Sequence, residues 1–288
     1  MKVRFPAILL LILLFSCSIP KQEREDVTFM RLATTVGVQH PHAKAAEYFA
    51  RLVERHSEGN MKVEVRPSGK DGDSIQNLEQ LSFGGLSIII IDSDKLLNAF
   101  PELSEVIHCY REASNPEAFL ISINEQLSGH GIIALTCYGP KTRGIFSSRY
   151  DVDDLASLEV GTVGGRMYLE LIQEDGMSAR TVKLGDSAGI LADFSIDAIE
   201  APIVDFASTD AYMFSHDVFL PDYERMPTLM LMNRRIFLSL DEQEKKNLLK
   251  DAELSRYYAD TLLRRAEETL MTRLRKEKNV IEEGELDV

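Results

Sequence analysis

The chain has 288 residues, of which 44% are hydrophobic and 27% are charged, and its formal net charge is -14 at pH 7. This length allows one large or two medium domains with a sizeable core. An acidic surface of this kind repels nucleic acid and anionic membranes, so we expect no nucleic-acid partner. The absence of low-complexity segments and short-period repeats argues against a disordered chain or a solenoid.

The N-terminus has the pattern of a secretory signal. Residues 1–16 place two basic side chains before an apolar run that is too short to span a bilayer comfortably. The run ends in LFSC, which resembles a bacterial lipoprotein box, in which the cysteine is lipidated and begins the mature chain. We therefore predict a signal peptide over 1–16 and a lipidated tether over 17–26, with Cys17 as the anchor. The alternative is an ordinary signal peptide cleaved near Ser18.

The first hundred residues predict the order β-α-β-α-β, which is typical of an open α/β sheet. The predicted elements are a strand at 27–35, a helix at 41–57, a strand at 61–65, a helix at 73–83 and a strand at 86–91. The last of these, LSIIII, is a β-branched run of the kind that is buried in a parallel sheet.

A similar alternation starts again near Gly131. Its predicted elements are strands at 131–139, 158–163, 179–184, 195–201 and 230–233, and a helix at 167–175. Ser239 and Glu242 have the spacing of a capping box at the start of a long helix over about 240–275. Two α/β units and one long C-terminal helix predict two lobes with a cleft between them.

The stretch LEVGTVGGRMYLE, residues 158–170, has the pattern of a strand, a glycine-rich turn and a helix. Turns of this kind often cradle phosphates. A phosphate loop requires G-x-x-x-x-G-K-[S/T], and a dinucleotide site requires G-x-G-x-x-G. The segment GTVGGRM satisfies neither pattern, so we expect no nucleotide cofactor.

Few residues suggest catalysis. His40 and His42 would face the same way on an extended segment, so a metal is conceivable, although a loop at a helix start is the simpler interpretation. No G-x-S-x-G elbow places a nucleophile. Once Cys17 is lipidated, Cys109 and Cys137 remain, either as a disulfide or as buried free thiols. We expect a protein that is not an enzyme and has no cofactor.

Four segments, in order, resemble the solute-binding proteins of tripartite ATP-independent periplasmic (TRAP) transporters. They are HPHAKAAEYF and the residues after it to Asp92, GIIALTCYGPKTRGIF and the residues after it to Val160, DAIEAPIVDF, and LMNRRIFLSLDEQEKKNLL. The resemblance covers roughly residues 28–285. It implies an α/β, two-lobed fold like that of periplasmic binding proteins, with the long C-terminal helix packing across both lobes. Lobe one would cover 27–137 and part of 230–288, and lobe two would cover 138–229.

The resemblance also implies a ligand site. In this family an arginine after the D-L-x-G turn grips the ligand carboxylate, and an asparagine precedes the proline of D-G-x-E-N-P. These positions are Gly161 and Ala201 in this chain. Arg166 follows Gly161 by five residues; it would either take over the arginine's role or face solvent at a helix start. The candidate ligand-binding residues are Arg143, which matches the family's other pocket arginine, Asp92, Gly161, Arg166, Ala201, His40 and His42.

The function that the resemblance implies is transport. The protein would be anchored by lipid in the periplasm, capture a small organic ligand by hinge closure, and deliver it to TRAP-type integral membrane subunits. Without the arginine and asparagine, we expect a ligand more apolar than the usual carboxylates. The alternatives are a sensory or scaffold lipoprotein that binds a regulatory protein, and a metal-dependent enzyme that uses His40 and His42.

Overall fold

The computed structural model describes residues 27–108, 110, 116–223 and 225–282. The predicted signal peptide, the tether with Cys17, and Cys109 lie outside the described residues. Within the described ranges, no helix is both long enough and apolar enough to cross a membrane.

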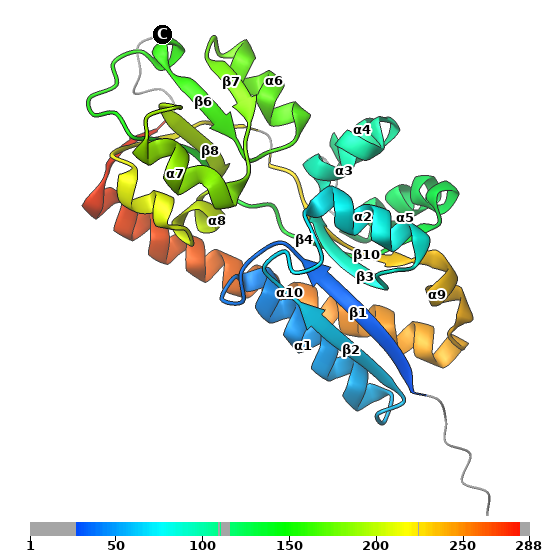
Figure 1. Ribbon diagram of the computed structural model, residues 1–288. Helices are drawn as coiled ribbons and strands as arrows, with labels where there is room; N and C mark the ends of the chain where they lie inside the picture. The colour runs from blue at the N-terminus through cyan, green and yellow to red at the C-terminus, as the bar shows by residue number, and fades with distance from the viewer. Residues whose placement is uncertain (1–26, 109, 111–115, 224, 283–288) are drawn as a thin grey trace, which may run out of the picture.

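The protein folds into two lobes, each built on its own β-sheet (Figure 1), which confirms the predicted two-lobed α/β fold. The first sheet has the order β2-β1-β3-β10-β4 and the second has the order β11-β9-β5-β8-β6-β7. The strands of the first sheet are β1 (Thr28–Thr34), β2 (Met61–Arg66), β3 (Ile88–Asp92), β4 (Ile132–Tyr138) and β10 (Thr228–Asn233). Those of the second are β5 (Arg143–Ser147), β6 (Glu159–Thr162), β7 (Ser178–Thr181), β8 (Ala198–Pro202), β9 (Asp217–Leu220) and β11 (Asn279–Glu282).

The first lobe has apolar side chains on both faces of its sheet. Met30 and Ile88 belong to one buried cluster, and Ala33 and Ile89 belong to the other, because successive side chains of a strand point to opposite faces. The helices of this lobe are α1 (Pro41–His56), α2 (Ser74–Phe83), α3 (Ser93–Ala99), α4 (Ser104–His108), α5 (Pro116–Leu127) and α9 (Arg234–Ser239). The residues predicted to lie in a parallel sheet form β3, which is parallel to β1 but antiparallel to β10, because β10 enters this sheet from the second lobe.

The second lobe is smaller in helix content and contains α6 (Arg166–Glu174), α7 (Ser187–Ala192) and α8 (Ile203–Ala207). Its core includes Phe146 stacked on Phe206, with ring centroids 3.9 Å apart. The final strand, β11, pairs in parallel with β9, so the end of the described chain returns to this lobe. The predicted strands did not include β9 or β11.

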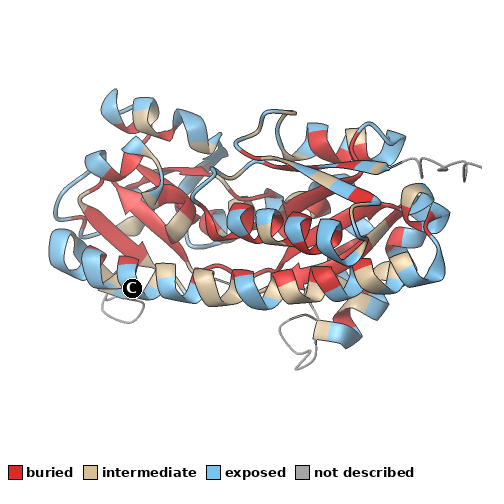
Figure 2. Cartoon of the chain, turned by 90° about the horizontal axis from the view of Figure 1, so that it is seen from below, coloured by how far each residue is buried: buried red, intermediate tan, exposed pale blue. Residues whose placement is uncertain are grey.

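The long helix α10 (Glu242–Glu277) runs along both lobes (Figures 1 and 2). Its 36 residues correspond to a length of about 54 Å. Leu248 packs into the first lobe, and Leu270 and Leu274 pack into the second, so one helix supports both cores.

The cap of α10 differs from the prediction. Asp241 and Glu244 form the capping box, not Ser239 and Glu242, since Asp241 accepts from the Glu244 backbone and Glu244 accepts from the Asp241 backbone. Ser239 instead ends α9, where its hydroxyl donates to the Ile236 carbonyl. The error has a simple source, because both boxes have the same spacing and lie two residues apart.

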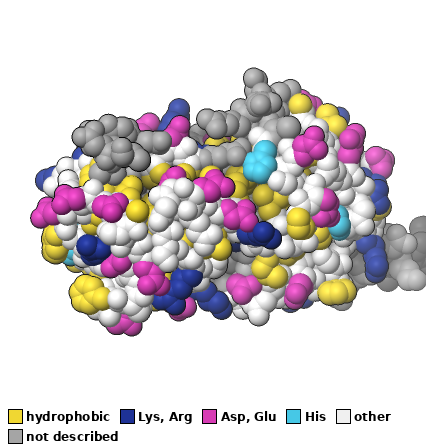
Figure 3. Space-filling model, turned by 90° about the horizontal axis from the view of Figure 1, so that it is seen from above, with side chains coloured by type: hydrophobic (Ala, Val, Ile, Leu, Met, Phe, Trp, Pro, Cys, Tyr) yellow, Lys and Arg dark blue, Asp and Glu magenta, His cyan; other side chains and the backbone are white. Residues whose placement is uncertain are grey.

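Charge is distributed broadly over the surface. Figure 3 shows acidic side chains spread over the face of the molecule that is seen from above, with basic side chains among them. This distribution is in keeping with the net charge of -14. The charged groups that concern function lie instead between the lobes.

Candidate functional site

Lys141 lies at the centre of the contact between the lobes. The segment between β4 and β5 carries it, and its ammonium donates to Asp92 Oδ2 and Asp205 Oδ2, both at 2.9 Å. Asp92 ends β3 in the first lobe, and Asp205 lies on α8 in the second. The Lys141 side chain is only 4% exposed, so this is a buried cation held by one carboxylate from each lobe.

His40 extends this network into α1. As the N-cap of α1, it accepts from the His42 backbone N–H through Nδ1 at 3.1 Å. Its other nitrogen, Nε2, lies 2.8 Å from Asp205 Oδ1 and carries the proton in this arrangement. Thr228 donates to the remaining oxygen of Asp92 at 2.5 Å. The continuous path from Thr228 through Asp92, Lys141 and Asp205 to His40 therefore satisfies both oxygens of both carboxylates.

Burial and charge act in opposite directions on these groups. Burial alone would raise the pKa of the Asp205 carboxyl, but Lys141 and His40 outweigh it and hold that pKa far below its usual range. Burial would likewise raise the pKa of Asp92, and Lys141 keeps it lowered. Burial disfavours charge on Lys141, yet the two carboxylates raise its pKa. All three groups are therefore charged at neutral pH.

His42 is fully buried and stacks on Tyr138, with ring centroids 4.9 Å apart. Burial, followed by the nearby His40 and Lys141, lowers its pKa well below the ordinary value, so the ring is neutral. The His40 and His42 rings meet edge to face with centroids 4.9 Å apart. Among the residues that the structure describes, these two histidines have no third His, Cys, Asp or Glu that would complete a metal site with them.

Arg143 is buried at the start of β5. Its Nε donates to Glu200 Oε1 at 2.5 Å and its Nη2 donates to Glu200 Oε2 at 3.0 Å, while its guanidinium lies 3.7 Å from the Tyr168 ring centroid. Burial alone would lower the pKa of Arg143, but Glu200 more than compensates and raises it. Thr162 also donates to Glu200, at 2.6 Å. The guanidinium is thus already engaged by a carboxylate of its own lobe.

Gly161 and Ala201 face the apolar interior of the second lobe. Gly161 lies opposite Ile199 in the register of β6 and β8. A Cβ atom at Gly161 would lie 2.9 Å from Val182 Cγ1 and 3.0 Å from both Ile196 Cδ1 and Ile199 Cδ1. Ala201 is fully buried in the cluster that contains Phe146 and Phe206. The two positions that the resemblance assigns to polar ligand-holding residues are therefore surrounded by hydrocarbon.

Arg166 is separate from this network. Its side chain is 81% exposed, and its Nε donates to Glu170 Oε1 at 2.7 Å on the surface of α6. The structure thus brings together Asp92, His40 and His42 around Lys141, places Arg143 with Glu200, and leaves the Arg166 guanidinium facing solvent.

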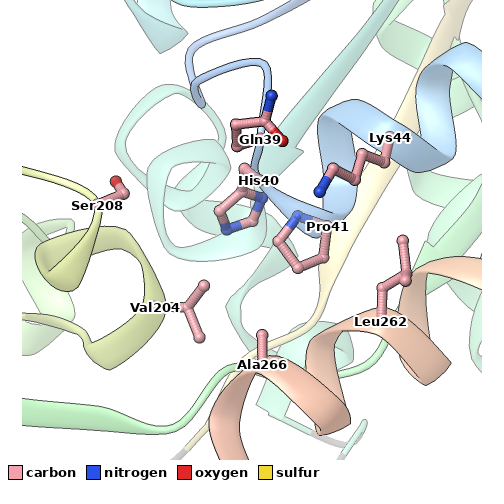
Figure 4. Close-up of a pocket in the computed structure, with 8 residues that line it drawn as sticks. All are labelled: Gln39, His40, Pro41, Lys44, Val204, Ser208, Leu262 and Ala266. Carbon is pink, nitrogen blue, oxygen red and sulfur yellow. The ribbon is translucent and has the colours of Figure 1, made fainter. Parts of the chain in front are cut away.

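A cavity of about 200 Å³ opens beside His40 (Figure 4). Elements from both lobes and α10 line it, and Figure 4 shows the His40 ring lying between α1, α8 and α10. The lining residues are Gln39, His40, Pro41, Lys44, Val204, Ser208, Leu262 and Ala266. The wall is mostly hydrocarbon, and it lies next to the His40–Asp205 bond.

Sequence reasoning missed Lys141, Asp205 and Glu200, although all three fall within the segments that carry the family resemblance. Their roles depend on partners that are distant in the chain: Lys141 is 49 residues from Asp92 and 64 from Asp205. The available signal was the position of Lys141, a charged residue between a buried strand and the pocket arginine.

The comparisons with known proteins agree on the family. Residues 32–286 match the family described as bacterial extracellular solute-binding protein, family 7. A curated solute-binding protein from Chromohalobacter salexigens is 21% identical over 224 residues, which cover 74% of this chain and 67% of the relative.

Solved structures of TRAP periplasmic solute-binding proteins show the same fold. One from Bradyrhizobium, in complex with galacturonate, has a TM-score of 0.78, is 19% identical and covers 88% of each chain. Another from Chromohalobacter salexigens, with bound D-glucuronate, has a TM-score of 0.80, is 18% identical and also covers 88% of each chain. A sugar acid binding protein from Advenella mimigardefordensis, in complex with galactonate, has a TM-score of 0.80, is 20% identical and covers 91% of this chain and 89% of its own.

Proposed function

Because this chain belongs to family 7 of the bacterial extracellular solute-binding proteins, we propose that it captures a small organic ligand between its lobes by hinge closure. It would then deliver the ligand to TRAP-type integral membrane subunits and catalyse no reaction. One observation carries the proposal: the hydrogen-bonded path through Asp92, Lys141 and Asp205 joins the two lobes at the place where they meet. Groups of both lobes thus contact one another around the segment that links β4 to β5, and contacts of this kind between lobes are what hinge closure uses to stabilise its closed form.

The ligand that suits this site is neutral or carries a single anionic group. Lys141 is already held by two carboxylates, and Arg143 is held by Glu200 through two hydrogen bonds. Gly161 and Ala201 are packed into the apolar interior of the second lobe and supply no hydrogen-bond donor side chain. A second carboxylate buried here would lose its hydration without gaining matched donors, which costs on the order of several kcal/mol.

Ligand identification tests this proposal directly. Mass spectrometry of the molecules that co-purify with the protein, followed by titration calorimetry, would establish the ligand. We expect a neutral or singly anionic compound to bind, and small dicarboxylates to bind weakly or not at all. Low-micromolar binding of a simple C4-dicarboxylate, abolished by Arg166→Ala, would overturn the proposed ligand class and favour Arg166 as the anion-binding residue. If no small molecule bound at all, the solute-binding proposal itself would be wrong.

We further propose that Cys17 carries the lipid anchor and holds the protein at the periplasmic side of a membrane. The support is the sequence alone, an apolar run followed by a small residue and a cysteine. Two or more lipid chains give stable attachment, whereas one chain gives only marginal binding.

A further inference from the structure

The N-terminus of α6 has no cap from its own segment. Gly165 occupies the N-cap position and has no side chain to accept from the first N–H groups of the helix. Two side chains of α3, in the other lobe, accept instead. Gly165 N donates to Asp94 Oδ2 at 2.6 Å, and Arg166 N donates to Asn98 Oδ1 at 3.1 Å. The helix is thus capped across the contact between the lobes, by residues about 70 positions earlier in the chain.

The approach of the two backbones explains the glycine at position 165. A Cβ atom there would lie 2.3 Å from the Asp94 carbonyl oxygen and 2.8 Å from its carbonyl carbon. Because real Cβ atoms do not approach backbone atoms so closely, any other residue at Gly165 would hold the lobes apart. The glycine at position 165 of this turn therefore permits a close contact between the two lobes.

The contact around this cap is both polar and apolar. The ammonium of Lys95, next to Asp94 on α3, donates to the carbonyl of Val163 in the turn. Met167, the second residue of α6, packs against the apolar cluster of the first lobe, together with Leu97 on α3. Figure 1 shows α3 and α6 facing each other across the gap between the sheets.

We propose that Asp94 and Asn98 are positioning residues that close the two lobes in the absence of a ligand. The N-terminus of a helix favours a negative charge, because its unpaired N–H groups and the helix dipole both attract an anion. Here the carboxylate comes from Asp94 of the opposite lobe. It accepts from the Gly165 amide in the turn that follows β6, the strand in which the family resemblance implies an arginine that would grip a ligand carboxylate. Closure in this protein therefore needs no carboxylate from the ligand, and the closed form predominates in the ligand-free protein.

The inference rests on the proposed hinge closure, but it is tested on ligand-free protein, so its failure and a failure to find a ligand are separate results. The protein is the mature chain with Cys17→Ser, stripped of bound small molecules. Small-angle scattering reports whether the lobes are closed, and hydrogen exchange reports the protection of the Gly165 and Arg166 amides. The test variants are Gly165→Ala, Asp94→Ala and Asn98→Ala.

We expect the ligand-free parent to scatter as the compact two-lobed structure. Gly165→Ala and Asp94→Ala should enlarge its radius of gyration, and Asp94→Ala should speed exchange of the two amides at least tenfold. Asn98→Ala changes an exposed side chain, and it should speed exchange mainly at the Arg166 amide. It therefore still tests the interlobe cap if the Asp94→Ala protein misfolds. Glu174→Ala, at the other end of α6, and Gly185→Ala, where a Cβ atom meets nothing within 4 Å, should leave both measurements unchanged.

Two results would overturn the proposal. One is a ligand-free parent that scatters as an open form and becomes compact only when ligand is added. The other is a set of folded Asp94→Ala and Gly165→Ala proteins whose scattering and amide exchange equal those of the parent.

Discussion

An arginine at position 161, where the family resemblance implies one, should not create a carboxylate-binding site in this chain. The substitution is Gly161→Arg, within β6. The family resemblance alone would predict that this change builds an anion site. In this fold, a side chain at position 161 starts among Val182, Ile196 and Ile199. The guanidinium would enter an apolar cluster in which none of these neighbours can accept a hydrogen bond.

The destabilisation of the Gly161→Arg protein has two parts. The first carbon alone would meet three methyl groups at 2.9–3.0 Å, and overpacking of a core costs about 1–3 kcal/mol. Gly161→Ala isolates this part and should lower the melting temperature by about 2–4 °C for each kcal/mol. An unpaired guanidinium adds a further cost on the order of several kcal/mol. Gly161→Arg should therefore be clearly less stable than Gly161→Ala.

Chemical denaturation and calorimetry would measure both effects. Gly185→Arg is the matched control, because a side chain there meets open space and the same charge is added to the same lobe. We expect the control to keep the stability of the parent. The reasoning would be refuted by a Gly161→Arg protein as stable as the parent that binds a sugar acid with micromolar affinity, since the arginine would then have reached the cleft.

Three other predictions concern charge, thiol reactivity and the anchor. Asp205 has a lowered pKa in the folded protein, so its contribution to stability is present above its unfolded pKa of about 3.9 and is lost as pH falls below that value. Asp205→Asn should therefore flatten the loss of stability that is measured between about pH 5 and pH 2. An unchanged slope would contradict this. Burial raises the pKa of the Cys137 thiol to about 12. In a Cys17→Ser, Cys109→Ser protein, a thiol reagent at pH 8 should therefore react only when denaturant unfolds the protein. Rapid reaction of the native protein would show that Cys137 is accessible. Cys17→Ser should move the protein from the membrane to the soluble fraction, whereas equal membrane attachment, or a mature terminus elsewhere, would disprove lipidation at this residue.

The sequence was sufficient for the fold because its signals are local. The β-branched run that became β3 and the amphipathic pattern of α1 depend on neighbouring residues, and both elements formed within a few residues of their predicted bounds. The same locality explains the errors. The short strand β11 has only four residues, and its pairing with β9 depends on a partner about 60 positions earlier.

The site was harder to predict because its geometry depends on contacts across the molecule. The family pattern pointed to Arg143, but its partner Glu200 lies 57 residues away. The sequence drew attention to the glycine-rich turn, which lacks the phosphate-loop pattern. It had no means to show that Asp94, on a different lobe, supplies the carboxylate that the Gly165 amide binds.

The glycine at position 161, where the family resemblance implies an arginine, and the interlobe cap belong to one physical problem. A ligand closes a hinge only to the extent that it binds the closed form more tightly than the open one. When a ligand carboxylate bridges the lobes, part of its binding free energy is used to close them, and a closed form populated at 1% weakens apparent affinity about a hundredfold.

With Asp94 on the α6 terminus and Lys141 between Asp92 and Asp205, the chain supplies those bridges itself. We propose that a ligand without a carboxylate that bridges the lobes therefore has less closure to drive. The same bridges must break before a ligand can enter. Asp94→Ala should therefore speed ligand association while it weakens closure. Stopped-flow kinetics with the identified ligand would show a faster association rate in that variant than in the parent. An association rate that falls together with affinity would mean that Asp94 contacts the ligand directly.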